Sequence, residues 1–183
     1  MSEDISDKEL LEQFRIESTR NMAFHLLVTK YQKRVYWQVR RIIIDHDDAN
    51  DVVQNVFIKV WKNLDGFKET SQLYTWLFRI ATNESLTFLK QKRAPLYVPF
   101  ENVERGLSRK LTDDNYFKAD EIETKLHNAI LTLPEKQRIV FNMRYYDETP
   151  YEEMSEILET SVGALKASYH HAVKKIEDFL KNN

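Results

Sequence analysis

Apolar residues recur at helical spacing in two stretches of the chain, residues 8–93 and 121–183. The pattern is clear between Val52 and Trp61, where apolar side chains return every three or four positions. Spacing of this kind predicts amphipathic helices that each bury one face. We therefore predict two small helical domains, each with a modest apolar core.

A polar segment, residues 94–120, separates the two stretches. It contains Pro95 and Gly106, and its polar run Thr112–Asn115 shows no helical period. We predict a flexible, mostly non-helical linker at this place.

Composition supports an all-α fold and argues against several classes of protein. Only three Gly and four Pro interrupt the 183 residues, and strong helix formers such as Leu, Glu and Lys are abundant. The chain has no Cys, which excludes disulfides, zinc–thiolate sites and thiol catalysis. The sequence has no phosphate-cradling glycine loop, nucleophile motif or paired metal ligands. We therefore expect no enzymatic activity, no metal and no cofactor.

The sequence shows no signal for export or membrane insertion. Residues 1–12 are acidic and lack the profile of a secretion signal. No apolar stretch approaches the roughly 20 residues that a membrane span needs. We expect a cytoplasmic protein without stable membrane insertion. Because the net charge is only −2, binding to DNA would have to use local basic patches.

The C-terminal stretch has the spacing of a helix-turn-helix motif. Pro134 can occupy the first turn of one helix. Thr149 can cap a second, short helix, in which Glu152 completes a capping box. Ser161 can cap a longer helix after a tight turn. The stripe that we expect to be buried on this longer helix consists of Leu165, Tyr169, Ala172, Ile176 and Phe179.

The opposite face of the longer helix is a candidate surface for contacts with duplex DNA. Small residues would let the helix approach base edges, and Lys and His can contact phosphates or acceptors in the major groove. The alternative is the solvated face of an ordinary helical bundle. The candidate residues are Lys166, Ala167, Ser168, His170, His171 and Lys174.

The N-terminal stretch contains a basic segment followed by an acidic one. The basic residues could form a phosphate track or an ordinary charged helix face; they are Lys30, Lys33, Arg34, Arg40 and Arg41. Acids then begin the next helix, at Asp47, Asp48 and Asp51, where the helix dipole favours them. The better functional interpretation of that helix is an acidic and aromatic face for a basic partner helix.

Aromatic and basic residues alternate between Phe67 and Arg93. Such a mixture suits a surface that stacks unpaired nucleotides and holds their backbone. Trp76 and Leu77 instead fit the spacing of a helical core. We expect the polar loop 68–73 and one helix flank to be the exposed part.

These motifs resemble the extracytoplasmic-function (ECF) sigma factors of bacterial RNA polymerase. The segment Asp47–Phe57, followed by Phe67 and the segment Tyr74–Asn83, is similar to their region 2. The segments Tyr151–Leu158 and Ser161–Lys166 are similar to their region 4. The resemblance covers nearly the whole chain, and both motif sets stand in the family's order.

The resemblance implies core RNA polymerase, promoter DNA and an anti-sigma protein as partners. It implies that region 2 docks on the polymerase clamp helices and captures an extruded base of the melted non-template strand, and that region 4 reads the minus-thirty-five element as duplex. The implied polymerase-binding residues are Asp48, Asp51, Gln54, Asn55, Phe57 and Trp61. The implied minus-ten residues are Arg41, Phe67, Lys68, Ser71, Gln72, Leu73, Tyr74, Arg79 and Asn83.

The chain departs from the family pattern in region 4. The family often has Thr-Val-Lys-Ser-Arg where this chain has Ala164–Ser168, and often Arg where it has His171, so we expect weaker or unusual minus-thirty-five binding. Glu159 stands where Gly is frequent, so we expect a different backbone in the turn. The alternative function is a dimeric helix-turn-helix regulator that binds palindromic DNA without polymerase.

Overall fold

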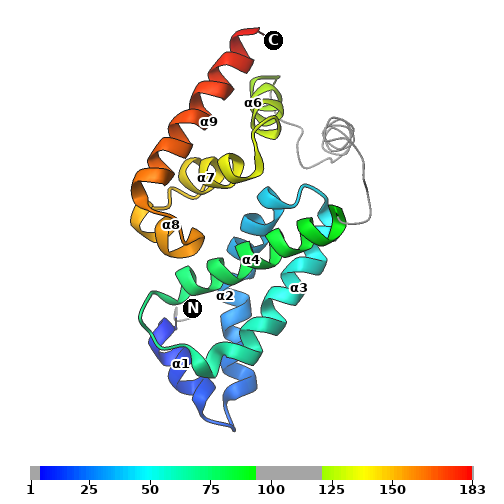
Figure 1. Ribbon diagram of the computed structural model, residues 1–183. Coiled ribbons are helices and arrows are strands. Elements are labelled where there is room, and N and C mark those ends of the chain that lie inside the picture. Colours follow the sequence, from blue (N-terminus) through cyan, green and yellow to red (C-terminus); the bar gives the residue numbers. More distant parts are fainter. Residues whose placement is uncertain (1–4, 94–120, 183) are drawn as a thin grey trace.

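The computed structural model describes residues 5–93 and 121–182, and this part of the chain contains helices and turns but no strand. The all-α prediction is confirmed, whereas the expected linker 94–120 lies outside the described residues. The N-terminal module consists of α1 (Asp7–Arg15), α2 (Arg20–Ile42), α3 (His46–Asn63), the short 3-10 helix η1 (Leu64–Gly66) and α4 (Leu73–Arg93) (Figure 1). The C-terminal module consists of α6 (Glu121–Leu131), α7 (Glu135–Tyr145), α8 (Tyr151–Leu158) and α9 (Val162–Asn182).

Side-chain caps fix the starts of two N-terminal helices. Ser6 and Glu9 form a reciprocal capping box on α1, in which the Glu9 amide donates to Ser6 Oγ at 3.2 Å and the Ser6 amide donates to Glu9 Oε2 at 3.0 Å. On α3 the Asp45 carboxylate accepts from the amides of Asp47 and Asp48, both at 3.1 Å. These caps satisfy amides that have no partner within the helix.

The helix-turn-helix forms from α8 and α9, but α7 and α8 begin differently from the prediction. Pro134 and Pro150 are the residues before the first helical turn, both with extended backbones, and neither α7 nor α8 has a side-chain cap. Thr149 is buried and lies one position too early, so the predicted capping box with Glu152 is wrong. The prediction for α9 is confirmed, because the Ala164 amide donates to Ser161 Oγ at 3.3 Å.

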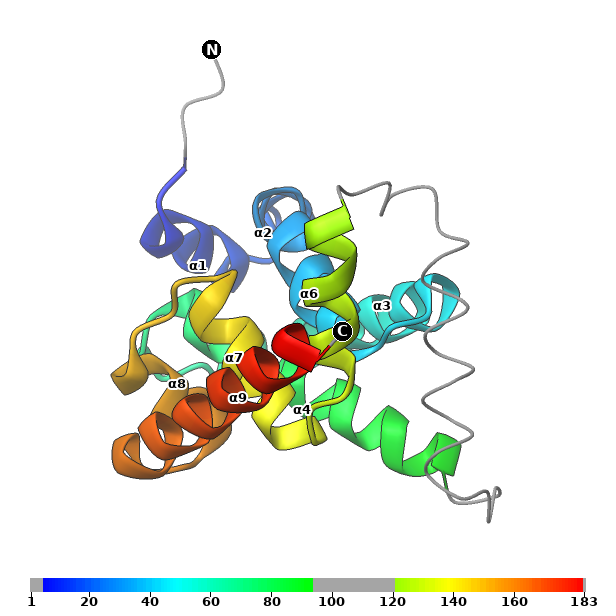
Figure 2. The same ribbon diagram turned by 90° about the horizontal axis from the view of Figure 1, so that it is seen from above.

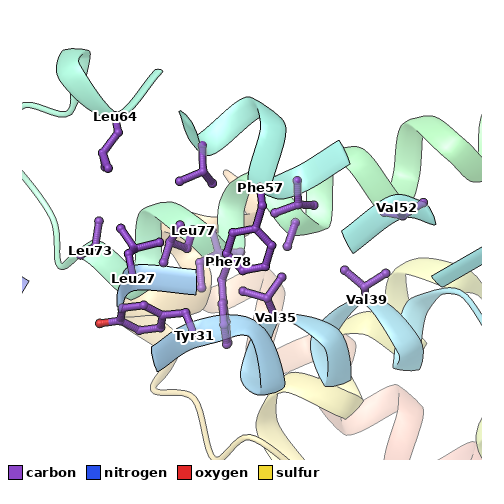
Figure 3. Packing of buried hydrophobic residues seen from close by; sticks show 14 of the residues in the cluster. Leu27, Tyr31, Val35, Val39, Val52, Phe57, Leu64, Leu73, Leu77 and Phe78 are labelled. Atoms are coloured by element: carbon purple, nitrogen blue, oxygen red, sulfur yellow. The ribbon is translucent and has the colours of Figure 1, made fainter. Parts of the chain in front are cut away.

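The N-terminal module packs around α2, whose apolar face meets α1, α3 and α4. Figure 3 shows how Val35 on α2, Phe57 on α3 and Leu77 on α4 point toward one another. Val35 and Leu77 are fully buried. The predicted 3.6-residue pattern therefore marks the core of this module correctly.

The main core extends into the C-terminal module, so the two predicted domains pack against each other, a point that the sequence left open. The cluster that holds the N-terminal apolar residues also includes, from α7, α8 and α9, Ile139, Val140, Met143, Met154, Ile157 and Leu165. Helix α8 packs on α4, and α7 packs on α2 (Figures 1 and 2). A second, smaller core belongs to the C-terminal module alone and consists of Ala129, Ile130, Leu133, Phe141, Ala172 and Ile176.

None of the described helices combines the length and the apolar character that a membrane span requires.

Candidate nucleic-acid and polymerase interfaces

The outward face of α9 is open. Side chains of Lys166, Ala167, His170, His171 and Lys174 are exposed, and that of Ser168 is partly buried. Within the described ranges, no ion pair involves these basic side chains, although the Lys166 ammonium lies 5.7 Å from the centre of the Tyr151 ring. The geometry thus leaves Lys and His free to contact an anionic duplex.

Gly163 lies exposed near the start of this face. A Cβ atom placed on it would meet nothing within 4 Å, so packing within the protein does not require glycine there. Gly in a helix costs about 1 kcal/mol relative to Ala. Its position on the outward face fits close approach to another molecule.

The turn between α8 and α9 contains a strained residue. Glu159 closes α8 with φ 50° and ψ 42°, the left-handed conformation. That is the conformation that glycine adopts without steric cost. The expectation of a different backbone at Glu159 is therefore wrong, because the glutamate takes the left-handed turn in spite of its side chain.

The exposed face of α3 carries most of the expected polymerase-binding residues. Asp51, Gln54, Asn55 and Trp61 are exposed. Trp61 makes edge contacts with Phe14 at 5.3 Å and Phe24 at 4.9 Å between ring centres, which fix its orientation.

Two other expected polymerase-binding residues are less accessible. Phe57 is 8% exposed and belongs to the core, because it lies on the inward stripe of α3. Asp48 is partly buried and forms an ion pair with Lys92 on α4. Ile58, on the same helix as Trp61, is 51% exposed, although its apolar side chain did not mark it as a surface residue.

The expected minus-ten residues divide into a buried and an exposed set. Phe67 and Leu73 are buried core residues, and the Phe67 ring lies 5.2 Å from that of Trp76. Both side chains are packed in the core of the N-terminal module, and their direct contact with DNA stays a prediction. The exposed or partly exposed set consists of Arg41, Lys68, Ser71, Gln72, Tyr74, Arg79 and Asn83.

The predicted phosphate track on α2 is not a continuous surface. Arg40 is buried, and its guanidinium donates to the Ile44 carbonyl. Lys30 donates to the Ile5 carbonyl at 2.8 Å and pairs with Asp7 at 3.0 Å. These contacts within the N-terminal module give the two basic residues structural roles.

Two arginines of the minus-ten set contact the C-terminal module. Arg41 forms an ion pair with Asp147, and its guanidinium carbon lies 4.8 Å from the centre of the Tyr146 ring. Arg79 forms an ion pair with Glu159, with Nε donating to Oε1 at 3.1 Å. No local pattern pointed to either partner, because 106 residues separate Arg41 from Asp147 and 80 residues separate Arg79 from Glu159.

Family models match both modules. The model described as Sigma-70 region 2 matches residues 27–94, and the one described as Sigma-70, region 4 matches residues 123–176. The chain is 33% identical over 186 aligned positions to the ECF RNA polymerase sigma-E factor of Escherichia coli K12, covering 97% of this chain and 96% of that protein. The chain belongs to the ECF sigma factors. The sigma-E factor of Haemophilus influenzae is 32% identical, with 97% of each chain covered.

Solved structures share the fold of this sigma factor. The structure of CnrH in complex with the cytosolic domain of CnrY matches with a TM-score of 0.69 and 22% identity, covering 97% of this chain and 98% of that one. The sigma factor RpoE of Bartonella quintana, in complex with the anti-sigma factor NepR, matches with a TM-score of 0.66 and 20% identity, covering 86% and 96%.

A cavity of about 250 Å³ lies between regions 2 and 4 of the sigma factor. It is lined by Trp37 and Arg41 of α2 and by residues of α6 and α7 that include His127 and Asn142. Burial, together with the positive charges of Arg40 and Arg138, lowers the pKa of His127.

Within residues 5–93 and 121–182, no group of three or more acidic or histidine side chains could hold a metal ion.

Proposed function

We propose that this ECF sigma factor binds core RNA polymerase through α3, recognises the minus-ten element through α4 and the preceding loop, and recognises the minus-thirty-five element through α9. The observation that carries the proposal is the presence of both sigma regions, in order, in one chain. The functional boundaries that we propose are 8–93 for region 2 and 121–183 for region 4, joined by the linker 94–120. The protein acts in the cytoplasm and is not an enzyme.

Polymerase docking is supported by the composition of the exposed α3 face. Asp51 and the amides of Gln54 and Asn55 offer acceptors to a basic partner helix, while Ile58 and Trp61 offer apolar contact area. Aromatic anchors surrounded by polar groups are typical of residues that dominate binding energy. Trp61 is held in place by its edge contacts with other rings, so little conformational freedom is lost on binding.

Minus-ten recognition is supported by two exposed polar residues on α4. Arg79 and Asn83 are four positions apart, so they lie on the same side of the helix. A guanidinium can hold a phosphate, and an amide can donate to and accept from a base edge. Extruding a base costs a few kcal/mol, which such contacts offset without a catalytic residue.

Minus-thirty-five recognition is supported by the open face of α9. This helix is the second of the helix-turn-helix, the one that enters the major groove in such motifs. The exposed Lys166 and Lys174 can contact phosphates, while His170 can contact base acceptors.

We also propose an anti-sigma protein as a partner.

The polymerase assignment is tested by the double variant Asp51→Ala with Gln54→Ala. We expect core-polymerase affinity, measured by fluorescence anisotropy, to fall about tenfold, with unchanged helical content. The matched control is Glu12→Ala with Gln13→Ala on α1, which likewise removes one carboxylate and one glutamine side chain. Equal affinity of the two double variants would refute docking through α3.

Base capture is tested separately by Asn83→Ala. We expect promoter opening, followed by permanganate reactivity, to decrease more than polymerase binding does. A variant that loses both to the same extent would contradict a specific contact with the extruded base.

A further inference from the structure

The junction between regions 2 and 4 contains an ion pair that is partly shielded from solvent. The carboxylate of Asp147, which follows α7, pairs with Arg41 at the end of α2, and both side chains are about one quarter exposed. Asn142 Nδ2 donates to the Arg41 carbonyl at 3.2 Å, and the Tyr146 ring lies against the guanidinium. Region 4 thus surrounds Arg41 with a charge, a hydrogen bond and a ring.

A second ion pair lies at the other end of the junction. Glu159, between α8 and α9, pairs with Arg79 on α4, and both side chains are well exposed. Glu159 holds an unfavourable left-handed backbone at a position where glycine would have no steric cost. Strain of this kind points to a use for the side chain, and the pair with Arg79 supplies one.

The apolar part of the junction excludes water beneath these pairs. Met154 and Ile157 of α8 are buried in the same cluster as Phe78 of α4. The closed arrangement is therefore stabilised by burial of apolar surface as well as by charge.

The junction is nevertheless less well packed and less fully hydrogen-bonded than an ordinary protein core. Three side-chain oxygens buried there have no hydrogen-bond partner among the described residues: Asn142 Oδ1, Asp147 Oδ2 and Glu153 Oε2. Each such oxygen costs free energy that contact with water would restore. The cavity of about 250 Å³ among α2, α6 and α7 is a packing defect at the same junction. These features favour a junction that can open.

We propose that Asp147 and Glu159 of region 4 compete with promoter DNA for Arg41 and Arg79 of region 2. The two ion pairs, here called the latch, hold the free protein closed. This inference rests on the proposed minus-ten role of the two arginines. A carboxylate and a phosphate bind a guanidinium in the same bidentate manner, so an arginine held in the latch is withdrawn from DNA. By linkage, the factor by which closure weakens DNA binding to the arginines equals the factor by which bound DNA weakens closure, so DNA that takes the arginines favours the open arrangement.

The first arm of the test measures the distance between the two regions. Because the chain has no Cys, a double variant with Cys at the exposed positions Ser18 and Lys175 can carry one spin label in each region. Double electron–electron resonance on the full chain should give one narrow distance without DNA. Adding a random-sequence single strand of about 16 nucleotides should produce a longer distance. A broad distribution before DNA is added would overturn the proposal, whatever the transcriptional activity.

The second arm compares two double variants that change the net charge equally. Asp147→Asn with Glu159→Gln removes the latch acids, while Glu177→Gln with Asp178→Asn removes two exposed acids of α9. We expect the latch variant to open at a DNA concentration roughly three- to tenfold lower than the control. Equal concentrations for the two variants would overturn the competition.

A third variant separates the latch from DNA binding. Exchanging the charges, Arg79→Glu with Glu159→Arg, should preserve the narrow distance and weaken DNA binding. A narrow distance in both the wild type and the exchange variant would support the latch even if no variant bound polymerase. Failure of the latch can therefore be told apart from failure of the proposed function. Loss of the narrow distance in a folded exchange variant would contradict the pairing of residues 79 and 159.

Discussion

The two candidate DNA surfaces of this sigma factor differ in what covers them. On α9 of region 4, Lys166, His170 and Lys174 are exposed and free of carboxylate partners within the described residues. In region 2, Arg41 and Arg79 are both paired with acids of region 4. If the proposed DNA roles hold, region 4 can contact a duplex in this arrangement, whereas Arg41 and Arg79 of region 2 must first leave their carboxylate partners.

The difference follows from where each surface lies relative to the shared core. Helix α9 contributes Leu165 to that core near its start and then runs away from region 2 (Figure 1). Helix α4 instead packs against α8, so a face of α4 lies at the junction. Packing, and not charge alone, decides which surface is covered.

The largest expected effect is on stability, from a large-to-small substitution in the core that the two regions share. Met154→Ala removes a fully buried side chain of α8 and should cost about 2–5 kcal/mol of unfolding free energy. All three tryptophans, Trp37, Trp61 and Trp76, lie in region 2. Tryptophan fluorescence during urea unfolding therefore tests whether a change in region 4 destabilises region 2.

The matched control is Ile176→Ala, which alters the smaller core of region 4. Its effect on the tryptophan-detected midpoint should be smaller than that of Met154→Ala. Equal midpoints for the wild type and Met154→Ala would show that the regions do not share a core.

Substitutions at Glu159 should have a smaller effect on stability, and they test whether its left-handed backbone is strained. Glu159→Gln keeps the strained backbone and removes the charge, whereas Glu159→Gly removes both. Because left-handed conformation costs a non-glycine residue about 1–2 kcal/mol, and glycine loses more chain entropy on folding, the Gly variant should be about 1 kcal/mol more stable than the Gln variant. Thermal unfolding measures this difference, and a less stable Gly variant would argue against strain.

The open face of α9 is tested by Gly163→Ala. The added methyl has free space in the protein, so the substitution should stabilise the helix by about 0.5–1 kcal/mol. Binding to the minus-thirty-five duplex should nevertheless weaken, because the methyl group separates the helix from the base edges. Tighter DNA binding would place Gly163 outside the contact surface.

The smallest expected effect is a pH dependence from Glu153. Burial, with a contribution from nearby Glu156, raises the pKa of Glu153 in spite of the attraction of Arg34. The folded protein therefore binds a proton more readily than the unfolded chain, so this group lowers stability as pH rises from about 4.5 through the folded pKa. Glu153→Gln should reduce that decline in urea unfolding series; an unchanged slope would contradict the assignment.

Local patterns predicted the helices better than they predicted accessibility. Apolar spacing correctly placed Leu165, Ala172 and Ile176 on the buried stripe of α9, whereas Tyr169 and Phe179 of the predicted stripe are only partly buried. Ser161 was correctly predicted as the cap of this helix. The same spacing could not separate a docking aromatic from a core aromatic, so Phe57 and Phe67 were assigned to surfaces although both are buried. Trp61 is exposed because it lies at the rim of the same apolar stripe.

Contacts between distant segments had no local signal. The latch joins Arg41 to Asp147 and Arg79 to Glu159. From the sequence alone, each of these four side chains could equally be a solvent-exposed charge without a partner. The backbone of the turn was not predictable either, because Glu159 takes the left-handed conformation that residue preference reserves mainly for glycine.

The most direct test of the proposed function is reconstitution of the purified chain with core RNA polymerase on a library of genomic fragments. We predict one-to-one association, measured by mass photometry, and new transcription start sites that share an upstream motif. A chain that ignored polymerase but bound palindromic duplex as a dimer would contradict the sigma-factor mechanism and favour an independent regulator.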